Sequence, residues 1–447
     1  MANYTKYDAE RVRLVGPEHD ELVYCGRIDD TDREAPVFVQ PGSFVRMSFS
    51  GSGWVRAVVV NRRRWHDSWV GALVDQTQYR RKIERDNVPE EVVLAEGLDR
   101  DLEHEVTFFK RMDQCHEFTF LGFLLERGAR VEKARKLPRK KIEFYGDSVT
   151  AGEVAEAVDY MRSLDPPHNG EFNNAYFSFA WATARKLHAR AHIVAQGGIA
   201  LLDGTGYYEP CPQSGQTAMN LQEGVSGSAR TEPGVQEGRQ GKTEPEGQEG
   251  RQEQPETHLQ QGRISQPETT WGRCGTVGME SCFDRVYFYP EDGQGGELSL
   301  AASGGADGVS RMQPRMERWN FARYTPHVVV VAIGQNDAHP EDIMRQDYRG
   351  AKAEEWRAHY KAWIQELRRI YPRAWIVLTT TILYHHPGWD RSIGRVCAEL
   401  NDPRIVHFLF EETGRGTPGH VRVSEAMNMA LELAGFIEGL SDRVWED

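Results

Sequence analysis

A serine between glycines is the residue of this sequence best suited to nucleophilic chemistry. Ser148 lies in the segment 146–152 (GDSVTAG), directly after an apolar run at 141–145 that predicts a strand. A serine there can present its hydroxyl at the edge of a sheet beside backbone N–H groups, as a nucleophile and its oxyanion hole require. The segment is neither a Gly-x-Ser-x-Gly elbow nor a P-loop, which disfavours an α/β-hydrolase and a nucleotide site. Taken alone, it could be a strand-to-helix turn capped by Asp147 or Ser148.

Three other segments carry groups that would complement this serine. Gly197 and Gly198 follow a predicted strand at 192–196, and their missing side chains let a backbone N–H approach a ligand. Asn336 follows the apolar run 328–333 and offers a neutral amide donor. His420 lies in a loop before the last predicted helix and could act as a base. A nucleophile, oxyanion donors and a base are therefore all present.

The elements that must position these residues alternate between strands and helices. Further strands are expected at 375–381 and 404–408, and helical patterns at 174–188, 353–371, 390–400 and 424–440. This alternation predicts an α/β domain over residues 139–440, with a parallel sheet covered by helices on both faces. Ligands of such sheets bind at the carboxyl ends of the strands, where the four candidate segments fall.

Residues 1–130 have a different texture, with short apolar runs separated by turn signals such as 41–43 (PGS) and 51–53 (GSG). Short strands at this spacing predict an antiparallel β-sandwich. A third region, 211–275, is rich in Gly, Gln, Glu and Pro, and segment 231–240 is echoed at 243–252. It has too few apolar residues to offset the entropy of ordering, so we expect a disordered insertion, and a second flexible piece at 292–310.

Composition narrows the classes of function. Lys and Arg number 54 and Asp and Glu 67, a net charge of −13 that disfavours nucleic acid as a partner. No apolar run is long enough for a membrane span and the N-terminus does not resemble a signal peptide, so we expect a cytoplasmic protein. The six cysteines form no C-x-x-C pair, which disfavours a zinc site and a disulfide framework. No cofactor and no metal is expected, and the oligomeric state is left open.

The motifs in this order resemble those of the SGNH (GDSL-type) hydrolases: Gly-Asp-Ser-x-Thr-x-Gly, a Gly block, Gly-x-Asn-Asp and a C-terminal His. The N-terminal region is similar to that of carbohydrate esterase family 2. That similarity is carried by Gly26-Arg27, Pro41-Gly42-Ser43, Phe49-Ser50-Gly51, Val74-Asp75, His104-Glu105-Val106 and Phe120-Leu121-Gly122-Phe123. The resemblance covers nearly everything except the insertion, and it implies a jelly-roll sandwich followed by a flavodoxin-like three-layer α/β/α hydrolase domain.

The resemblance implies Ser148 as nucleophile and His420 as general base. It implies three oxyanion donors: the Ser148 N–H, the Gly198 N–H in preference to that of Gly197, and the Asn336 side chain. Asp337 would be structural.

The superfamily often has an Asp three residues before the His, and many members of the family have one two before it. Thr417 and Pro418 stand there instead. The expectation is then a Ser-His dyad with a backbone carbonyl holding the imidazole, the alternative being an acid such as Glu411 or Glu412. His385 and His386 are the main rivals to His420.

Flat aromatic faces match sugar rings, and Trp389, Trp319 and Tyr207 are the residues we expect to bind substrate. The resemblance implies a carbohydrate O-acetyl esterase that removes acetyl groups from xylo- or manno-oligosaccharides through an acetyl-enzyme. Two alternatives remain at this point: a lipid or thioester hydrolase of the same superfamily, and a catalytically silent glycan-binding protein.

Overall fold

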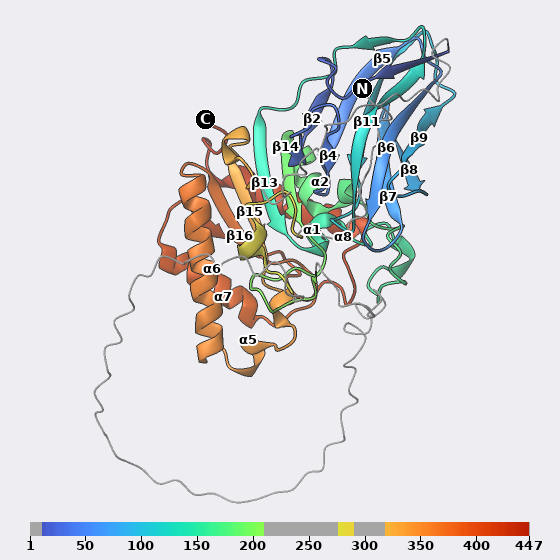
Figure 1. The fold of residues 1–447 in the computed structure, drawn as a ribbon. Helices are drawn as coiled ribbons and strands as arrows, with labels where there is room; N and C mark the ends of the chain where they lie inside the picture. The colour runs from blue at the N-terminus through green and yellow to red at the C-terminus, as the bar shows by residue number, and fades with distance from the viewer. Residues whose placement is uncertain (1–10, 210–275, 290–317, 447) are drawn as a thin grey trace, which may run out of the picture.

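The computed structural model describes residues 11–209, 276–289 and 318–446, and its N-terminal part is built of antiparallel strands (Figure 1). The strands are β1 (Val12–Val15), β2 (Val23–Cys25), β3 (Ile28–Asp29), β4 (Val37–Phe38), β5 (Phe44–Ser50), β6 (Trp54–Arg63), β7 (Ser68–Val74), β8 (Thr77–Ile83), β9 (Pro89–Glu96), β10 (Glu103–Lys110), β11 (His116–Glu126) and β12 (Arg130–Glu132). They form two sheets, β3-β4-β11-β6-β9 with β1 paired to β11, and β12-β5-β10-β7-β8 with β2 paired to β5.

The two sheets share one apolar core. Val45, Met47 and Phe49 alternate along β5 and are buried, as expected for a strand with one face on a core. Phe108 of β10 meets Phe118 of β11 across the sheets, with ring centroids 5.3 Å apart. The expected antiparallel sandwich is therefore present, whereas the jelly-roll connection and the domain bounds 1–130 and 139–440 stay predictions.

A second, parallel sheet lies in the C-terminal half of the chain. Its strands are β13 (Lys140–Gly146), β14 (Ala189–Ala195), β15 (Val328–Ala332), β16 (Trp375–Thr379) and β17 (Ile405–His407). The order β14-β13-β15-β16-β17 is that of flavodoxin-like sheets. Gly146 is in register with Ala195 on one side and Ala332 on the other, so these three strands end side by side. The order of the strands thus brings the three candidate segments after them to one edge.

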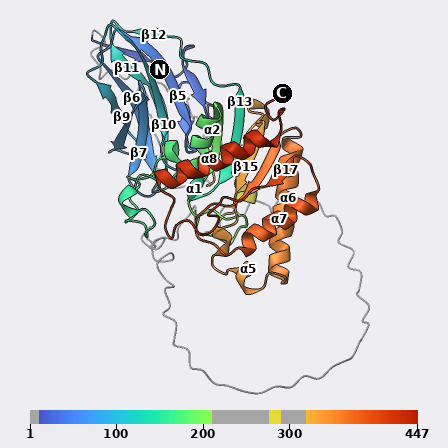
Figure 2. The same ribbon diagram turned by 180° about the vertical axis from the view of Figure 1, so that it is seen from behind.

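Helices cover both faces of the parallel sheet. The longer ones are α2 (Phe179–Lys186), α6 (Ala351–Ile370), α7 (Gly388–Leu400) and α8 (Val423–Leu440). The shorter ones are α1 (Ser148–Ala151), α4 (Met279–Cys282), α5 (Ile343–Gln346) and the 3-10 turns η1 (Val158–Tyr160), η2 (Ala175–Phe177), η3 (Phe321–Arg323) and η4 (Asn336–Ala338). Figure 2 shows α8 crossing the face of the sheet that is hidden in Figure 1.

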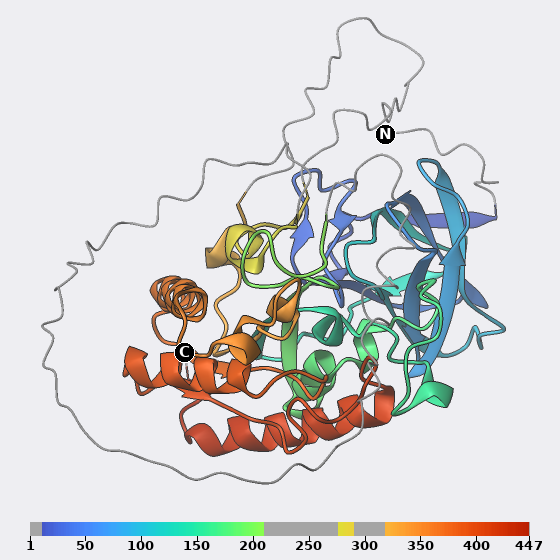
Figure 3. The same cartoon turned by 90° about the horizontal axis from the view of Figure 1, so that it is seen from below.

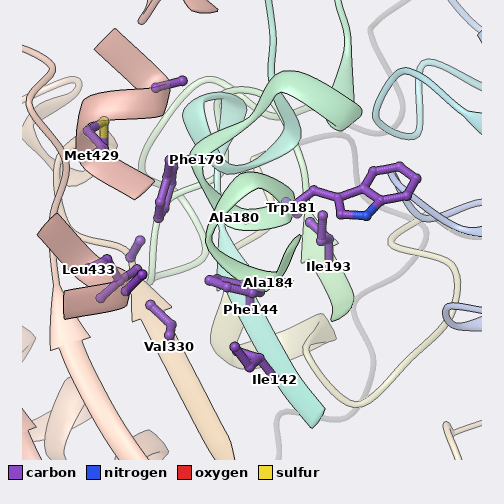
Figure 4. Packing of buried hydrophobic residues seen from close by; sticks show 14 of the residues in the cluster. Ile142, Phe144, Phe179, Ala180, Trp181, Ala184, Ile193, Val330, Met429 and Leu433 are labelled. Carbon is purple, nitrogen blue, oxygen red and sulfur yellow. The ribbon is translucent and has the colours of Figure 1, made fainter. Parts of the chain in front are cut away.

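The packing explains the three layers. Phe179 of α2 and Leu433 of α8 belong to one buried cluster with Val330 of β15 (Figure 4). The next residue of that strand, Val331, belongs to a second cluster with Trp356 of α6. Neighbouring side chains of a strand point to opposite faces, and helices cover both faces of this sheet. Every residue of β15 is therefore buried, and the strand is apolar throughout.

A buried ion pair joins the sandwich to the parallel sheet, and Figure 3 shows the blue strands of the sandwich beside the C-terminal domain. Arg27, between β2 and β3, is 0% exposed, and its Nη2 lies 3.0 Å from Glu143 Oε1 of β13. The same nitrogen donates to the hydroxyl of Tyr145 (2.6 Å), and Tyr371 donates to the other oxygen of Glu143 (2.6 Å). Each charge is thus hydrogen-bonded, which buried charges require.

The elements expected after residue 139 are found, with one difference. The helix expected at 174–188 is divided, because Ser178 ends η2 and caps α2 by accepting the N–H of Trp181 (3.3 Å). The expected disordered insertion 211–275 and the expected flexible piece 292–310 lie outside the described residues, as do Cys211 and Cys274.

Two further findings bear on the expectations from composition. Cys25, Cys115, Cys282 and Cys397, the cysteines of the described ranges, are free thiols. None of the helices over residues 11–209, 276–289 and 318–446 is long and apolar enough to span a bilayer. The cytoplasmic location stays a prediction.

Candidate active site

Ser148 stands at the point where β13 becomes α1. The Asp147 carboxylate caps the helix by accepting the N–H of Val149 (3.0 Å), and Ser148 is buried, with 3% of the residue exposed. A Cβ on Gly146 would stand 2.0 Å from Thr150 Oγ1, so only glycine permits this tight turn. The strand-to-helix turn considered from the sequence is therefore present, and it carries the candidate nucleophile.

Gly198 follows the neighbouring strand β14. It has a φ of +74°, and a Cβ there would stand 2.9 Å from Cβ of Tyr207, so glycine is required. The N–H of Gly197 donates to Asp113 Oδ2 (2.8 Å) and is occupied. In the part of the chain that the structure describes, the N–H groups of Ser148 and Gly198 donate to no other group. They are free to bind an oxyanion, in agreement with the preference for Gly198 over Gly197.

Asn336 follows β15, and its amide is already engaged. Nδ2 donates to Asp147 Oδ2 (3.1 Å) and to the carbonyl oxygen of Ile199 (3.0 Å). Both hydrogens are therefore used, and Asn336 can serve as the expected oxyanion donor only by giving up one of these bonds. Gln335 Nε2 donates to the same oxygen of Asp147 (2.6 Å). Asp147 thus ties the ends of β13 and β15, and burial raises its pKa to about 6 despite these donors.

Asp337 ties the loop together, as expected. Its carboxylate accepts the N–H of Leu201 (3.0 Å) and Nε1–H of Trp356 (2.7 Å). Burial raises its pKa to about 7, although these donors favour the charged form. The group therefore supports the loop after β14 from the loop after β15.

His420 is held by a carboxylate that the sequence did not indicate. Its Nδ1 lies 2.5 Å from Asp165 Oδ2, and its backbone N–H donates to Asp165 Oδ1 (2.9 Å). Arg422 Nη2 donates to that second oxygen (2.7 Å). The expected dyad with a backbone carbonyl is therefore wrong, and so is the alternative acid: Glu411 and Glu412 are exposed, and Glu412 pairs with Arg162.

Asp165 was missed because it lies far from Thr417 and Pro418, where an acid was sought. It belongs to an irregular segment between η1 and η2, with no periodicity that would mark it as part of a site. One signal was available: in 165–168 (DPPH) a carboxylate and an imidazole flank two prolines, which fix the backbone between them. An acid and a histidine in a stiffened loop are a reasonable candidate pair for a site.

The protonation of His420 follows from its neighbours. Burial alone disfavours the imidazolium, but the hydrogen bond to Asp165 and the nearby Glu153 carboxylate outweigh it and raise the pKa of His420 above 6.5. Its Nε2 lies 3.9 Å from Glu153 Oε2. Glu153 in turn donates its backbone N–H to the carbonyl oxygen of Ser148 (2.9 Å), so it connects the serine turn to the imidazole.

Within the described ranges, no hydrogen bond joins the Ser148 hydroxyl to the imidazole of His420. Catalytic hydrogen bonds are often long or poorly aligned before substrate binds and tighten in the substrate complex, so proton transfer requires the two groups to approach each other there. His385, the main rival, is committed elsewhere: Nδ1 lies 2.7 Å from the carbonyl oxygen of Leu383 and Nε2 lies 3.1 Å from Asp390 Oδ2.

One group of side chains at the site has metal-ligating chemistry. Ligand atoms of Asp165, His168 and His420 lie within 4.8 Å of one another. However, the oxygens of Asp165 already accept from His420 and Arg422, and the guanidinium beside them opposes a cation. The donor set therefore fits a hydrogen-bonded network better than a metal ion.

Two of the three aromatics expected to bind substrate are buried. Trp389 is 0% exposed, lies in α7, and packs edge-on against Trp356 with ring centroids 5.2 Å apart. Trp319 is 5% exposed, under the guanidinium of Arg27. Neither can stack on a sugar, so these expectations are wrong. Both indoles are packed inside the protein, where their large apolar surface is buried.

Tyr207 is half-buried against Gly198 and stacks on His339, with ring centroids 4.2 Å apart; its substrate role stays a prediction. Sequence reasoning did not single out Tyr384, which is 64% exposed. With Arg415, Thr417 and Pro418 it lines a surface hollow of about 320 Å³ beside the loop that leads to His420.

Comparison with known proteins finds relatives in sequence and in fold. Residues 24–134 match the family model described as Carbohydrate esterase 2 N-terminal. The Cellulase/esterase CelE of Acetivibrio thermocellus is 30% identical over 187 residues, which are 41% of this chain and 22% of that protein. The Acetylxylan esterase / glucomannan deacetylase of Cellvibrio japonicus is 29% identical over 200 residues, 45% of this chain and 53% of that protein. The chain thus spans about half the length of the second relative, and less of the first.

One solved structure is similar to this chain over most of the length of both proteins. A family two carbohydrate esterase from Clostridium thermocellum, in complex with cellohexaose, has a TM-score of 0.60 at 23% identity, with 93% of this chain and 98% of that chain covered. At this identity the likeness shows a shared fold. By its N-terminal family model, its fold and its ordered motifs, the chain resembles the SGNH hydrolases of carbohydrate esterase family 2.

Proposed function

We propose that this protein is a carbohydrate O-acetyl esterase with Ser148 as nucleophile, His420 as general base and Asp165 as the carboxylate that orients it. One observation carries the proposal: an imidazole held at Nδ1 by a carboxylate lies beside Glu153, whose backbone N–H binds the carbonyl oxygen of Ser148. Among the described residues, the N–H groups of Ser148 and Gly198 are free beside that serine. This combination is what acyl transfer needs.

The reaction would proceed in two steps, acetylation of Ser148 and hydrolysis of the acetyl-enzyme. Oγ of Ser148 attacks the acetyl carbonyl carbon while its proton passes to Nε2 of His420, and the oxyanion is held by the N–H groups of Ser148 and Gly198. The C–O bond to the sugar then breaks, and the sugar oxygen takes the proton from His420. Water attacks the acetyl-enzyme with His420 again as base, which releases acetate and restores the serine.

The substrate class rests on the relatives and on exposed aromatic surface. The names of the two curated relatives refer to cellulase/esterase and to acetylxylan esterase / glucomannan deacetylase activity, and the solved structure holds cellohexaose. Tyr384 is 64% exposed and offers a ring face to a sugar beside the loop that leads to His420. We therefore propose acetylated xylo- or manno-oligosaccharides as substrates.

The binding-protein alternative drew support from the missing acid before His420, and the contact between Asp165 and His420 favours the enzyme instead. A lipid or thioester hydrolase would need to accept a long acyl chain. Comparing 4-nitrophenyl acetate with 4-nitrophenyl octanoate tests this alternative, and faster cleavage of octanoate would favour it.

The decisive experiment is acetate release from acetylated xylo- and manno-oligosaccharides by the wild type, Ser148→Ala and His420→Ala. We expect both variants to lose at least about 10³-fold in kcat, since each removes a reacting group. Ser281→Ala, a surface serine that donates to Asp203, is the control and should match the wild type. Full activity in Ser148→Ala would refute the mechanism, and saccharide binding without hydrolysis by the wild type would restore the binding-protein alternative.

A further inference from the structure

A second histidine lies beside the candidate catalytic pair and bridges two carboxylates. Nδ1 of His168 lies 2.8 Å from Glu153 Oε1, and Nε2 lies 3.3 Å from Asp165 Oδ2. The His168 and His420 rings are 5.4 Å apart between centroids. The two histidines therefore share Asp165. On each ring, Glu153 lies near the nitrogen that does not contact Asp165.

Glu153 occupies a sensitive position. Its Oε2 is the atom 3.9 Å from Nε2 of His420, the nitrogen that must take the proton of Ser148. Its other oxygen is engaged by His168. A carboxylate free to move fully onto Nε2 would hold His420 as an imidazolium and block its use as a base.

We propose that His168 is a positioning residue that keeps the Glu153 carboxylate off Nε2 of His420 while it holds Asp165 against Nδ1. The inference rests on the proposed function, because it assigns His168 a role only if His420 is the base. His168 does this as a cation: its positive charge balances both carboxylates and opposes the protonation of His420.

The charges that face this cluster come from several elements and fit a cationic His168. Arg422, at the start of α8, binds Asp165. His66, from a loop of the sandwich, interacts with Glu153, Asp113 and His168, and Asp147 interacts with the charge of His420. Burial opposes the imidazolium of His168, but the bonds to Asp165 and Glu153 raise its pKa to about 10. Burial also opposes the charge of Glu153, but the histidines around it lower its pKa to about 2.

The test compares the pH dependence of kcat/KM on 4-nitrophenyl acetate for the wild type, His168→Gln and the double variant Glu153→Gln/His168→Gln. The base must be neutral, so activity falls below the pKa of His420. Loss of the His168 cation should raise that pKa and move the acidic limb up by about one pH unit. Removing the Glu153 charge as well should move it back. A role limited to supporting the fold would lower activity at every pH and would not be reversed by the second change.

The matched control is His359→Gln. His359 lies on α6, away from the site, and its Nδ1 is 2.9 Å from Glu280 Oε2. Its profile should coincide with that of the wild type. An unchanged acidic limb in a folded, active His168→Gln would overturn the inference while leaving the proposed function intact. A wild type inactive on every ester would instead refute the proposed function.

A measurement on the wild type covers the case in which His168→Gln does not fold. The ¹⁵N chemical shifts of the imidazoles should show His168 doubly protonated at pH 8, with His420 losing its proton at a lower pH than His168. A His168 that is neutral at pH 8 would overturn the inference.

Discussion

The strand edge and the irregular segment 156–171 contribute to the same site by different means. Ser148 and Gly198 follow strands whose ends are fixed by the hydrogen-bonded register of Gly146 with Ala195. Asp165 follows no strand, and its place depends on partners from other parts of the chain, above all Arg422. A site can therefore combine groups that a sheet positions with groups that only tertiary contacts position.

The sandwich supplies many of the contacts that hold this segment. Nη2 of the buried Arg111, just after β10, lies 2.5 Å from Glu156 Oε2 and donates to the carbonyl oxygen of Glu171 (3.2 Å). The N–H of Asp67 donates to the carbonyl oxygen of Asn169 (3.2 Å). The sandwich thus acts on the geometry of Asp165 and His168 from outside the parallel sheet.

Among the substitutions that test the two parts of the site, Asp165→Asn should have the largest effect on activity. The amide nearly keeps the shape of the carboxylate but removes the charge that orients His420 and stabilises its imidazolium. We expect kcat to fall on the order of 10²–10⁴-fold. Tm should fall as well, because the buried Arg422 loses its carboxylate partner. Stopped-flow and steady-state hydrolysis of 4-nitrophenyl acetate would measure this, and a kcat within twofold of the wild type would mean that His420 needs no carboxylate.

Site residues that follow strands could be predicted from the sequence, whereas a site residue held only by tertiary contacts could not. Ser148, Gly198 and Asn336 could be found because apolar runs mark their strands and parallel strands end at one edge. Asp165 could not be found in this way, since no local pattern relates it to His420, 255 positions away. The substrate role expected for Trp389 was wrong for another reason: the residue lies in α7, which begins at Gly388, and its indole is buried in the core.

The strand edge can be probed by Gly198→Ala. The added Cβ would stand 2.9 Å from Cβ of Tyr207 in a left-handed backbone conformation, so the N–H donor must move. We expect kcat to fall by about 10–100-fold at nearly constant KM, since an oxyanion donor acts mainly in the transition state. Gly204→Ala is the control for backbone strain alone, because its φ is +80° and no atom lies within 4 Å of the added Cβ. Equal loss of kcat in both variants would contradict the role of Gly198.

The smallest effect is expected from the contacts between the sandwich and segment 156–171. Arg111→Leu would leave Glu156 without its buried partner, and we expect a loss of about 2–3 kcal/mol in the free energy of unfolding. Activity should fall by about tenfold or less as Asp165 loosens. Arg80→Ala removes an ion pair with Glu171 that is about one third exposed, and it should cost less than about 1 kcal/mol. Urea unfolding would measure both, and equal costs would show that Arg111 is not the main support.

The buried pair between Arg27 and Glu143 makes the two domains poor candidates for recombination. The C-terminal part expressed without the sandwich would retain Glu143 in β13 with no guanidinium to neutralise it. Such an uncompensated charge costs about 3–5 kcal/mol, a large part of the stability of an ordinary domain. Engineering that shuffles hydrolase domains between scaffolds would therefore have to transplant Arg27 with Glu143, or replace both with apolar residues of matching volume.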